Sequence, residues 1–448
     1  MEKHSHTAKN PPPPSVPVKN WVGDKGKIIE PLFADYFLWQ HPMRCFQGRL
    51  FTVDGMIEDE APLKKKIYEL IRYYVTTSVA RRIEHILQAI KLSCASEPPE
   101  IQTDRIHVKN GTYFIDGYFT SEKEYCMNRL PIAYLPDSPA PSRWLQFLDE
   151  LLYEEDIPAL QEYIGYCLLP VTKAQKMLLM VGKGGEGKSR IGLILRELFG
   201  SSMHTGSLQK VETNRFARAD LEYKLLLVDD DMKTEALPQT NNIKTIVTLE
   251  DKIEIERKGM QSVQGTLYVR FACFGNGSLH ALYDKSNGFY RRQLLITTKE
   301  KPANRVDDPF LIDKMRNEKE SILLWALEGL QRLVQNNYQF TISERTAQNL
   351  KEAMEQGNNI LGFLKSEGYF EIRQGTKCKS TDFYKVYERW CLDNLEKPLA
   401  ASTFIHHLKD NQKSLGIVYD DKCIGTNRGF HNVDVDLFLP VDVPSPWD

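Results

Sequence analysis

A phosphate-binding loop constrains the fold of this chain more than any other feature. Residues 182–189 fit the pattern Gly-x-x-x-x-Gly-Lys-Ser at every fixed position. A short apolar run, 177–181, precedes the loop and is typical of a buried parallel strand. A segment with helical spacing, 190–199, follows the loop and ends at Gly200, a suitable helix C-cap. Strand, loop and helix in this order predict an α/β nucleotide-binding core with a parallel sheet.

The loop residues predict contacts to the phosphates of a nucleoside triphosphate. Glycines let backbone N–H groups turn toward phosphate oxygens, and the helix N-terminus adds positive potential there. We expect Lys188 to reach the β- and γ-phosphates and Ser189 to offer its hydroxyl to Mg²⁺. With ATP and Mg²⁺ as the expected cofactors, the nucleotide-binding residues are Gly182, Lys183, Gly184, Gly185, Glu186, Gly187, Lys188, Ser189 and Arg190.

The composition excludes several classes of protein but does not indicate a binding partner. The 448 residues are enough for several domains, and the net charge of -2 gives no overall sign of nucleic-acid binding. Any DNA contact must therefore come from local patches. The 8 cysteines form no C-x-x-C pair, which argues against a zinc ribbon and a disulfide framework. No apolar stretch approaches the roughly 18 residues that span a bilayer, so we expect a cytoplasmic protein with no membrane partner.

The chain divides by composition into five regions. Residues 1–20 include a run of prolines and are expected to form a disordered or extended tail. Residues 21–120 are expected to form an N-terminal mixed α/β domain, with a hairpin at 105–115 around an Asn-Gly turn. The other regions are a helical collar at 121–170, the nucleotide-binding core with its lid at 171–340, and a C-terminal unit at 358–440.

The C-terminal unit carries the pattern of a DNA-reading module. We expect helices at 383–392 and 401–410, followed by strands at 417–424 and 430–439. Helix, turn, helix and β-ribbon make a winged helix. The candidate base-reading residues on its second helix are Ser402, Thr403, His406 and Lys409.

Hydrolysis of a nucleoside triphosphate requires a carboxylate that holds the Mg²⁺ ion and a group that activates water. The apolar run 225–228 ends in two aspartates, and we expect Asp229 to coordinate Mg²⁺ and Asp230 to activate water. The reverse assignment is also open, as is an acidic turn with no catalytic role. A further strand, 267–274, leads to Asn276, whose amide is expected to hold the attacking water.

Two basic features follow these carboxylates in the sequence. Arg291 and Arg292 precede an apolar run, and one subunit of a ring can insert such a guanidinium into its neighbour's site. The segment 252–261 predicts a β-hairpin with Arg257 and Lys258 near its tip, and a cationic tip can track a phosphate backbone. The structural alternatives are a salt-bridged strand edge for the arginines and a solvated hairpin.

The order of these motifs resembles that of the superfamily 3 helicases, which are ring-forming AAA+ motors of viruses, phages and plasmids. The segments 128–134 and 160–166, together with the phosphate loop, resemble the phage and plasmid primase–helicase branch more closely. The tail 383–404 resembles the C-terminal winged helix of that branch. The resemblance covers about residues 120–440.

The resemblance implies a role for each matched residue. The run 256–258 is similar to that of papillomavirus replicative helicases, which implies that Lys258 contacts DNA; those proteins have a histidine where this chain has Gly259. By register with them, Arg292 is the better arginine finger and Arg291 the second choice. The other implied roles are a phosphate-loop pair in Lys188 and Ser189, an acidic pair in Asp229 and Asp230, and a water-sensing amide in Asn276.

The resemblance also implies a homo-hexameric ring that moves 3′→5′ on single-stranded DNA and unwinds forked DNA. Many relatives carry a primase domain ahead of the helicase, whereas residues 1–120 are short for one and lack a zinc-knuckle spacing. We therefore expect no priming activity in this chain, with a primase or replication initiator as a separate partner. Two other functions stay open: an initiator that melts an origin through its winged helix, and an ATP-switched DNA-binding scaffold without unwinding.

Overall fold

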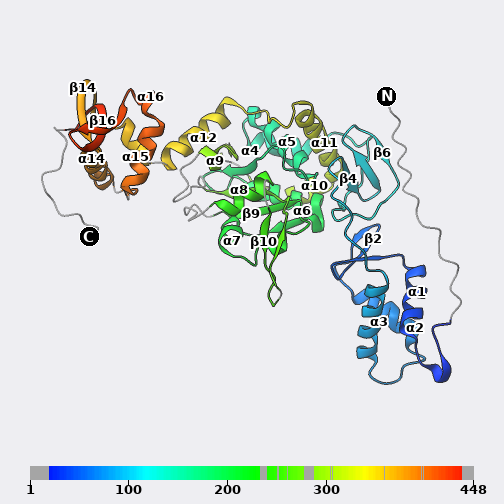
Figure 1. Ribbon diagram of the computed structural model, residues 1–448. Helices are drawn as coiled ribbons and strands as arrows, with labels where there is room; N and C mark the ends of the chain where they lie inside the picture. The colour runs from blue at the N-terminus through cyan, green and yellow to red at the C-terminus, as the bar shows by residue number, and fades with distance from the viewer. Residues whose placement is uncertain are drawn as a thin grey trace, which may run out of the picture.

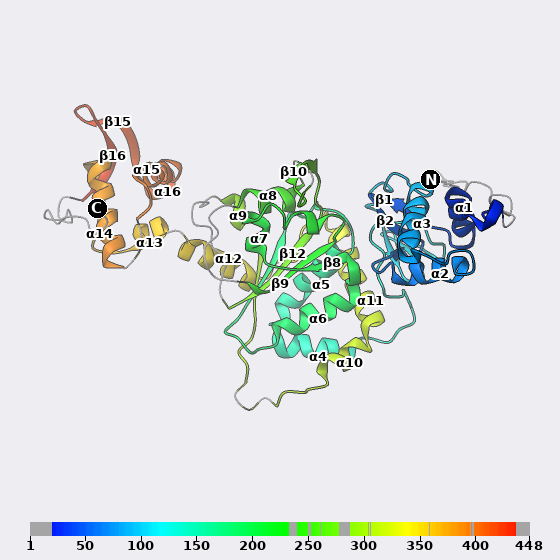
Figure 2. The same ribbon diagram turned by 90° about the horizontal axis from the view of Figure 1, so that it is seen from below.

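The computed structural model describes residues 20–232, 240–249, 252–259, 261–276, 287–302, 304, 306–357, 359–394, 396 and 398–435. An N-terminal unit and a C-terminal unit lie on opposite sides of a central α/β unit (Figures 1 and 2). Residues 1–19 of the predicted tail lie outside the described residues. None of the helices in the described ranges is both long and apolar enough to cross a bilayer.

Three helices and a small antiparallel sheet form the N-terminal unit. In the second helix, apolar residues recur with helical spacing, so that Leu63, Ile67 and Ile71 are all buried. Their core also contains Trp21 and Phe33. The elements are α1 (Glu30–Gln40), β1 (Arg44–Phe46), β2 (Arg49–Thr52), β3 (Gly55–Met56), α2 (Ala61–Ile71) and α3 (Val79–Ser93), after a short 3₁₀ helix, Asp24–Gly26.

A second antiparallel sheet consists of β4 (Arg105–Val108), β5 (Gly111–Phe114) and β6 (Phe119–Thr120). The hairpin predicted at 105–115 is confirmed by the β4–β5 pairing. Its side chains Ile106, Val108 and Tyr113 lie in the core of the central unit, together with Trp144. This hairpin therefore packs with the central unit, although the sequence analysis places it in the N-terminal domain.

The central unit contains a sheet of five parallel strands in the order β13-β7-β12-β9-β8. This arrangement confirms the predicted α/β class and its parallel sheet. Every residue of the inner strand β7 is buried, as expected for a parallel sheet covered on both faces. The strand bounds are β7 (Met177–Val181), β8 (Met203–Thr205), β9 (Leu226–Met232), β12 (Arg270–Gly275) and β13 (Gln293–Thr297).

Alternate side chains of each strand enter two different cores. Leu178 and Met180 pack with helices α4 (Ser142–Leu151), α5 (Ile157–Cys167), α6 (Lys188–Phe199) and α11 (Lys319–Gln335). Leu179 packs on the opposite face with α7 (Leu208–Thr213) and α8 (Asn241–Thr248). The remaining helices of the unit are α9 (Asn287–Tyr290), α10 (Leu311–Arg316) and α12 (Glu344–Gly357), with 3₁₀ helices Glu154–Asp156, Gly200–Ser202 and Ala219–Leu221.

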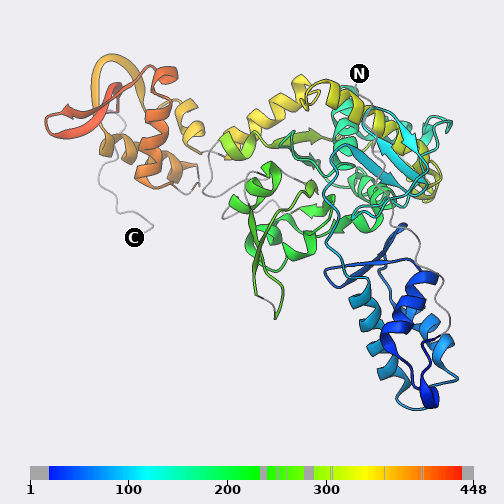
Figure 3. The same ribbon diagram turned by 45° about the vertical axis from the view of Figure 1, so that its right-hand side comes forward.

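A β-hairpin extends from the central unit (Figure 3). It consists of β10 (Ile253–Ile255) and β11 (Val263–Gly265), paired antiparallel. Ile253 and Ile255 are buried against the central unit, while Glu254 between them is exposed. The hairpin predicted in segment 252–261 is therefore confirmed, with its return strand slightly beyond that segment.

The C-terminal unit combines a three-stranded antiparallel sheet, in the order β14-β16-β15, with four helices. Its core is aromatic, and the rings of Tyr387 and Phe404 stack at 4.6 Å between centroids. The two predicted helices and the ribbon are confirmed as far as Asp434, and residues 436–439 of the second predicted strand lie outside the described residues. The first strand of the sheet was not predicted. The elements are α13 (Asn359–Lys365), β14 (Glu371–Lys379), α14 (Ser380–Asp393), α15 (Ala401–Asp410), α16 (Gln412–Leu415), β15 (Val418–Ile424) and β16 (Asn427–Asp434).

Two glycines allow α5 and α11 to cross at very short distance. A Cβ added to Gly165 of α5 would lie 2.3 Å from the carbonyl oxygen of Ala326. A Cβ added to Gly329 of α11 would lie 2.5 Å from the carbonyl oxygen of Gln161. Both contacts are with backbone atoms, which cannot move aside as a side chain can. This crossing holds the helices that cover one face of the parallel sheet.

We predict that Gly165→Ala lowers the free energy of unfolding by at least about 2 kcal/mol, because overpacking against backbone outweighs the better helix propensity of alanine. The measurement is urea denaturation. Gly192→Ala in α6 is the matched control, since the nearest atom there is a side-chain atom, Phe274 Cε2, at 3.3 Å. Equal losses of stability at the two positions would contradict the prediction.

Candidate nucleotide-binding site

The phosphate loop lies at the carboxyl end of β7, between Val181 and the first residue of α6, Lys188. β7 is flanked by β12 and β13, and the chain leaves it through α6 to reach β8 at the far edge of the sheet. The strand order therefore reverses at β7. In open α/β sheets, ligands bind at the carboxyl ends of strands at such a point.

The glycines of the loop are needed for two different reasons. Gly184, Gly185 and Gly187 have φ values of +105°, +83° and +116°, a backbone region in which side chains are strained. Gly182 is needed for space, because a Cβ there would lie 2.2 Å from Thr298 Oγ1. The loop thus has the tight turn and the close packing expected from its sequence pattern.

A cleft of ≈ 390 Å³ opens beside the loop. It brings together most of the predicted nucleotide-binding residues with groups from β9 and β12. Of the predicted loop residues, Lys183 instead pairs with Glu300 at 2.5 Å, and both side chains are exposed. The cleft is lined by Gly184, Gly185, Glu186, Gly187, Lys188, Ser189, Arg190, Asp230, Asp231, Phe274, Gly275, Asn276 and Asp307.

Lys188 is buried at the bottom of the cleft and contacts two polar side chains. Its Nζ donates to Glu186 Oε2 at 2.7 Å and lies 3.5 Å from Asn276 Oδ1. Glu186 Oε1 accepts the N–H of Gly184 at 2.7 Å. Burial raises the pKa of Glu186, but hydrogen bonds from Lys188 and from backbone N–H groups outweigh it, so this pKa lies below its ordinary value. The carboxylate is therefore ionised at neutral pH and neutralises Lys188.

The structure corrects the placement of Asp229. Its side chain lies on the face of β9 opposite the cleft, beside Cys273 of β12, and is 5 % exposed. Its Oδ2 accepts the N–H of Leu208, the first residue of α7, at 2.8 Å. Burial raises the pKa of Asp229 above its ordinary value. A carboxylate held in this way is not available to a metal ion in the cleft, so the predicted Mg²⁺ role does not fit its position.

A β-bulge explains why the next two aspartates line the cleft. The β12–β9 register shifts between the pairs Cys273–Asp229 and Gly275–Met232, so β9 contains one more residue than β12 across this interval. Asp230 and Asp231 are exposed, and Asp230 Oδ1 lies near α6, 3.9 Å from a Cβ placed on Gly192. The bulge turns both carboxylates toward the loop.

Oxygen ligands for Mg²⁺ are available from Ser189 and Asp230. The described residues contain no group of three or more His, Cys, Asp or Glu side chains that could hold a metal ion. Mg²⁺ binds through one or two carboxylates and takes its other ligands from phosphates and water. The residues present therefore fit a metal ion that enters with a nucleotide.

Arg291 and Arg292 lie at the other end of the sheet. Arg292 is 7 % exposed, and its guanidinium donates to the carbonyl oxygen of Gly288. Arg291 is exposed. Both precede β13 at its amino end, next to the start of β7, whose five residues at ~3.3 Å each span about 16 Å. Neither guanidinium can reach the loop of its own chain, and Arg291, predicted as second choice, is the more accessible to a neighbouring subunit.

The two predicted DNA-contacting residues of the hairpin differ in exposure. Arg257 is half-buried and pairs with Glu222. Lys258 is exposed at the turn, next to Gly259 with φ +76°. Glu256 pairs with Arg215 at 3.1 Å, so ion pairs on both sides hold the end of β10 against the central unit. Lys258 is left as the outward-facing cation of the pair.

The predicted base-reading residues of α15 also fall into two groups. Ser402, Thr403 and His406 are exposed, while Phe404 and Leu408 on the opposite side are buried in the aromatic core. The Nζ of Lys409 lies 3.5 Å from the ring centroid of Tyr419 on β15. Lys409 therefore fixes α15 against the ribbon instead of extending outward.

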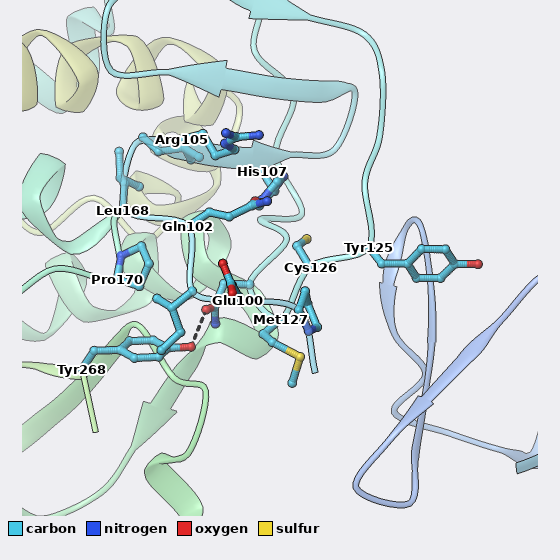
Figure 4. A pocket seen from close by; sticks show the side chains of 14 residues that line it. Glu100, Gln102, Arg105, His107, Tyr125, Cys126, Met127, Leu168, Pro170 and Tyr268 are labelled. Carbon is cyan, nitrogen blue, oxygen red and sulfur yellow. Dashed lines mark hydrogen bonds between the residues drawn. The ribbon is translucent and has the colours of Figure 1, made fainter. Parts of the chain in front are cut away.

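A second pocket has a structural role. It has a volume of ≈ 30 Å³, and its lining includes Gln102, His107, Cys126 and Tyr268 (Figure 4). His107 Nε2 lies 2.7 Å from Gln102 Oε1, and burial, followed by the charge of Arg129, lowers the pKa of His107 to about 3. The Tyr268 hydroxyl donates to Asn128 Oδ1 at 2.8 Å. The space accommodates about one water molecule, and both His107 and Tyr268 have hydrogen-bond partners within the chain.

Comparison with known proteins adds one partial family match. A model of a family of unknown function (DUF5906) matches residues 180–292, from the end of β7 to Arg292. Among solved structures, the A form apo structure of the NrS-1 C terminal region is 12% identical, with a TM-score of 0.49 over 90% of this chain and 100% of that chain. Another apo structure of the NrS-1 C terminal region is 12% identical, with a TM-score of 0.47 over 91% and 100% of the two chains. No curated protein matches the sequence.

Sequence reasoning missed four of the residues that line the cleft, namely Asp231, Phe274, Gly275 and Asp307. Asp231 was not predicted as a site residue, because the bulge that turns it inward depends on pairing with β12. Asp307 comes from the segment after β13 and belongs to no motif. Phe274 was predicted as part of a strand, and only the side on which β12 meets α6 places its ring at the cleft.

We predict that Asp230→Ala lowers the rate of nucleotide hydrolysis at least about 100-fold, equivalent to ~2.7 kcal/mol, because it removes a carboxylate from the cleft. Asp229→Ala is the matched variant and should instead lower the free energy of unfolding by about 2 kcal/mol, because the Leu208 N–H loses its buried partner. Steady-state hydrolysis and urea denaturation separate the two effects. Greater loss of hydrolysis in Asp229→Ala, with its stability unchanged, would restore the assignment made from the sequence.

Proposed function

We propose that this protein is an ATP-driven DNA helicase of the AAA+ superfamily 3 kind, acting as a ring in the replication of a phage or mobile element. One observation supports it above all others. Lys188, Asn276 and the carboxylates of Asp230 and Asp231 surround one cleft at the switch point of a parallel sheet. Phosphoryl-transfer sites combine a cation, a carboxylate and a polar group in this way.

The residues of the cleft divide the work of hydrolysis. Lys188 offsets charge on the β- and γ-phosphates, and backbone N–H groups of the loop hold their oxygens. Ser189 and Asp230 would hold Mg²⁺, which would offset further phosphate charge when it is bound. In this proposal Asn276 orients the attacking water and Asp231, which lines the same cleft, accepts its proton. Asp230 and Asp231 lie on β9, Asn276 directly follows β12, and the loop that leads to Lys188 and Ser189 follows β7, so the sheet sets the distances between these groups.

A ring is proposed because Arg291 lies too far from the loop of its own chain to act there, so that only a neighbouring copy could bring it to the cleft. Arg291 is exposed, at the opposite end of β7 from the loop. If adjacent copies pack with the amino end of one sheet facing the cleft of the next, Arg291 enters the neighbour's site and stabilises the transition-state charge. A homo-hexamer provides this contact at each interface.

The hairpin is the proposed contact with single-stranded DNA, and the central unit contains a route between it and β9. Asp229 binds the first residue of α7. Arg218 then donates to the carbonyl oxygens of Val211 in α7 and Glu254 in β10, at 3.2 and 3.1 Å. A shift of β9 on hydrolysis would thereby be transmitted through α7 to β10, the strand that leads into the turn with Lys258.

A second candidate function concerns the C-terminal unit, which we propose is a winged helix that reads duplex DNA. The exposed side chains Ser402, Thr403 and His406 form one face of α15, next to the β15–β16 ribbon. In helix-turn-helix modules the second helix enters the major groove, and α15 would be that helix here. An initiator that melts an origin would use this unit, alone or with a separate primase or initiator protein.

The test of the proposed function is an ATPase and unwinding assay on forked duplexes that have a single-stranded tail of either polarity. We expect single-stranded DNA to stimulate ATP hydrolysis, and unwinding to depend on the 3′ tail. Lys188→Ala should abolish both activities, because the phosphates lose their buried cation. ATP binding without hydrolysis or unwinding would favour the ATP-switched scaffold, and normal turnover by Lys188→Ala would refute the site.

We predict that Lys258→Ala leaves basal ATP hydrolysis within about twofold of the wild type, while unwinding falls at least about 10-fold, or 1.4 kcal/mol. The lysine is exposed at the hairpin turn and has no contact with the cleft. Lys65→Ala, an exposed lysine of α2, is the matched control. Unwinding by Lys258→Ala at the rate of Lys65→Ala would mean that the hairpin does not move the strand.

A further inference from the structure

The donors of the phosphate loop already have an anionic partner within the chain. Glu186 is 2 % exposed, although it occupies one of the variable positions of the loop pattern. One of its oxygens accepts the N–H of Gly184, and the other accepts from Lys188 Nζ, both at 2.7 Å. These are the two kinds of donor, backbone N–H and lysine ammonium, that a phosphate-binding loop offers to a phosphate.

Packing around Gly182 shows that this carboxylate fills the loop. A Cβ placed on Gly182 would lie 2.9 Å from both Glu186 Oε1 and Lys188 Nζ, and 2.2 Å from Thr298 Oγ1. The ion pair therefore lies directly against the loop backbone, below Thr298 of the segment after β13. A phosphate cannot take these donors while the Glu186 carboxylate keeps its place, because both anions require the same positions.

We propose that Glu186 caps the loop from within and that every phosphate ligand must displace it. This inference rests on the proposed nucleotide site and names the residue that sets its affinity. The loop then has two states, one closed by Glu186 and one open to phosphate. In such an equilibrium the apparent dissociation constant is the intrinsic one divided by the fraction of open loops.

The two-state scheme and simple charge repulsion predict different effects of Glu186 on a series of ligands. Displacing Glu186 has the same cost for every ligand that takes its donors. The cap therefore weakens the binding of ATP, ADP and pyrophosphate by one common factor. Simple repulsion by a nearby carboxylate would instead grow with the charge of the ligand. A ligand without phosphate, such as adenosine, is unaffected by the cap. The common factor also favours release of ADP after hydrolysis, because the carboxylate returns to the loop.

The experiment compares wild type with Glu186→Gln and Glu186→Ala by isothermal titration calorimetry. The ligands are a non-hydrolysable ATP analogue, ADP, pyrophosphate and adenosine. We expect each variant to bind the three phosphate ligands about 10-fold more tightly, by equal factors, which corresponds to a wild-type open fraction of about 0.1. Glutamine keeps the size of the side chain and can still accept the Gly184 N–H, so a change in affinity in both variants reports on the charge.

Glu300→Gln is the matched control, because Glu300 pairs with the other lysine of the same loop, Lys183, at an exposed position. Its affinities should stay within about twofold of the wild type. Unchanged affinity in both Glu186 variants, with a wild type that binds nucleotide, overturns the cap and leaves the proposed function intact. A gain in affinity that increases with the charge of the ligand also overturns the cap. Binding of phosphate ligands by the Glu186 variants alone supports the cap, whereas binding by no variant refutes the cap and the site together.

Discussion

Hydrogen bonding of β7 between β12 and β13 is the constraint on which the rest of the structure depends. β7 is buried along its whole length and ends at Val181, where the phosphate loop begins. Because its neighbours run parallel to it, their carboxyl ends meet the loop at the same edge of the sheet. Asn276 and Asp230 reach the cleft by this geometry, although they are distant from the loop in the sequence. The helices on the two faces then hold the sheet, most closely at the crossing of α5 and α11.

The same strand that carries the cleft carboxylates also connects the cleft with the hairpin. Within β9, Asp230 and Asp231 face the loop, while Asp229 faces α7 and binds its first N–H. Arg218 extends this contact to β10. A buried charge in a parallel sheet is retained only when it is well paired, and the Leu208 N–H supplies a partner for Asp229. One acidic run thus serves two faces of the sheet, as the proposed coupling between the cleft and the hairpin would require.

Charge balance around Lys188 links the fold to the proposed chemistry. A buried ammonium requires an anion in each state of the protein. In the described structure Glu186 meets this requirement, and the loop keeps its shape with its own carboxylate inside. In the nucleotide-bound state the phosphates would replace it. The loop is therefore preorganised at the level of its backbone, while its electrostatic partner can be exchanged.

Patterns within short segments were sufficient to predict many elements from the sequence. The strand, loop and helix around residues 177–199, the hairpin that carries Lys258, and the two helices and ribbon of the C-terminal unit all depend on local spacing and on glycines at turns. β14 was missed because most of its side chains are exposed and show no apolar alternation. It is a strand only because it pairs with β16.

By itself, the sequence determined the phosphate loop, the α/β class and the residue types available for catalysis, because each follows from neighbours along the chain. Only the tertiary structure decided which aspartates enter the cleft, since a bulge opposite β12 sets the direction of each side chain. It also decided that Arg292 is buried while Arg291 is exposed, and that the hairpin at 105–115 joins the central core. These outcomes depend on strand register and on packing between segments far apart in the chain, which no local pattern of residues encodes.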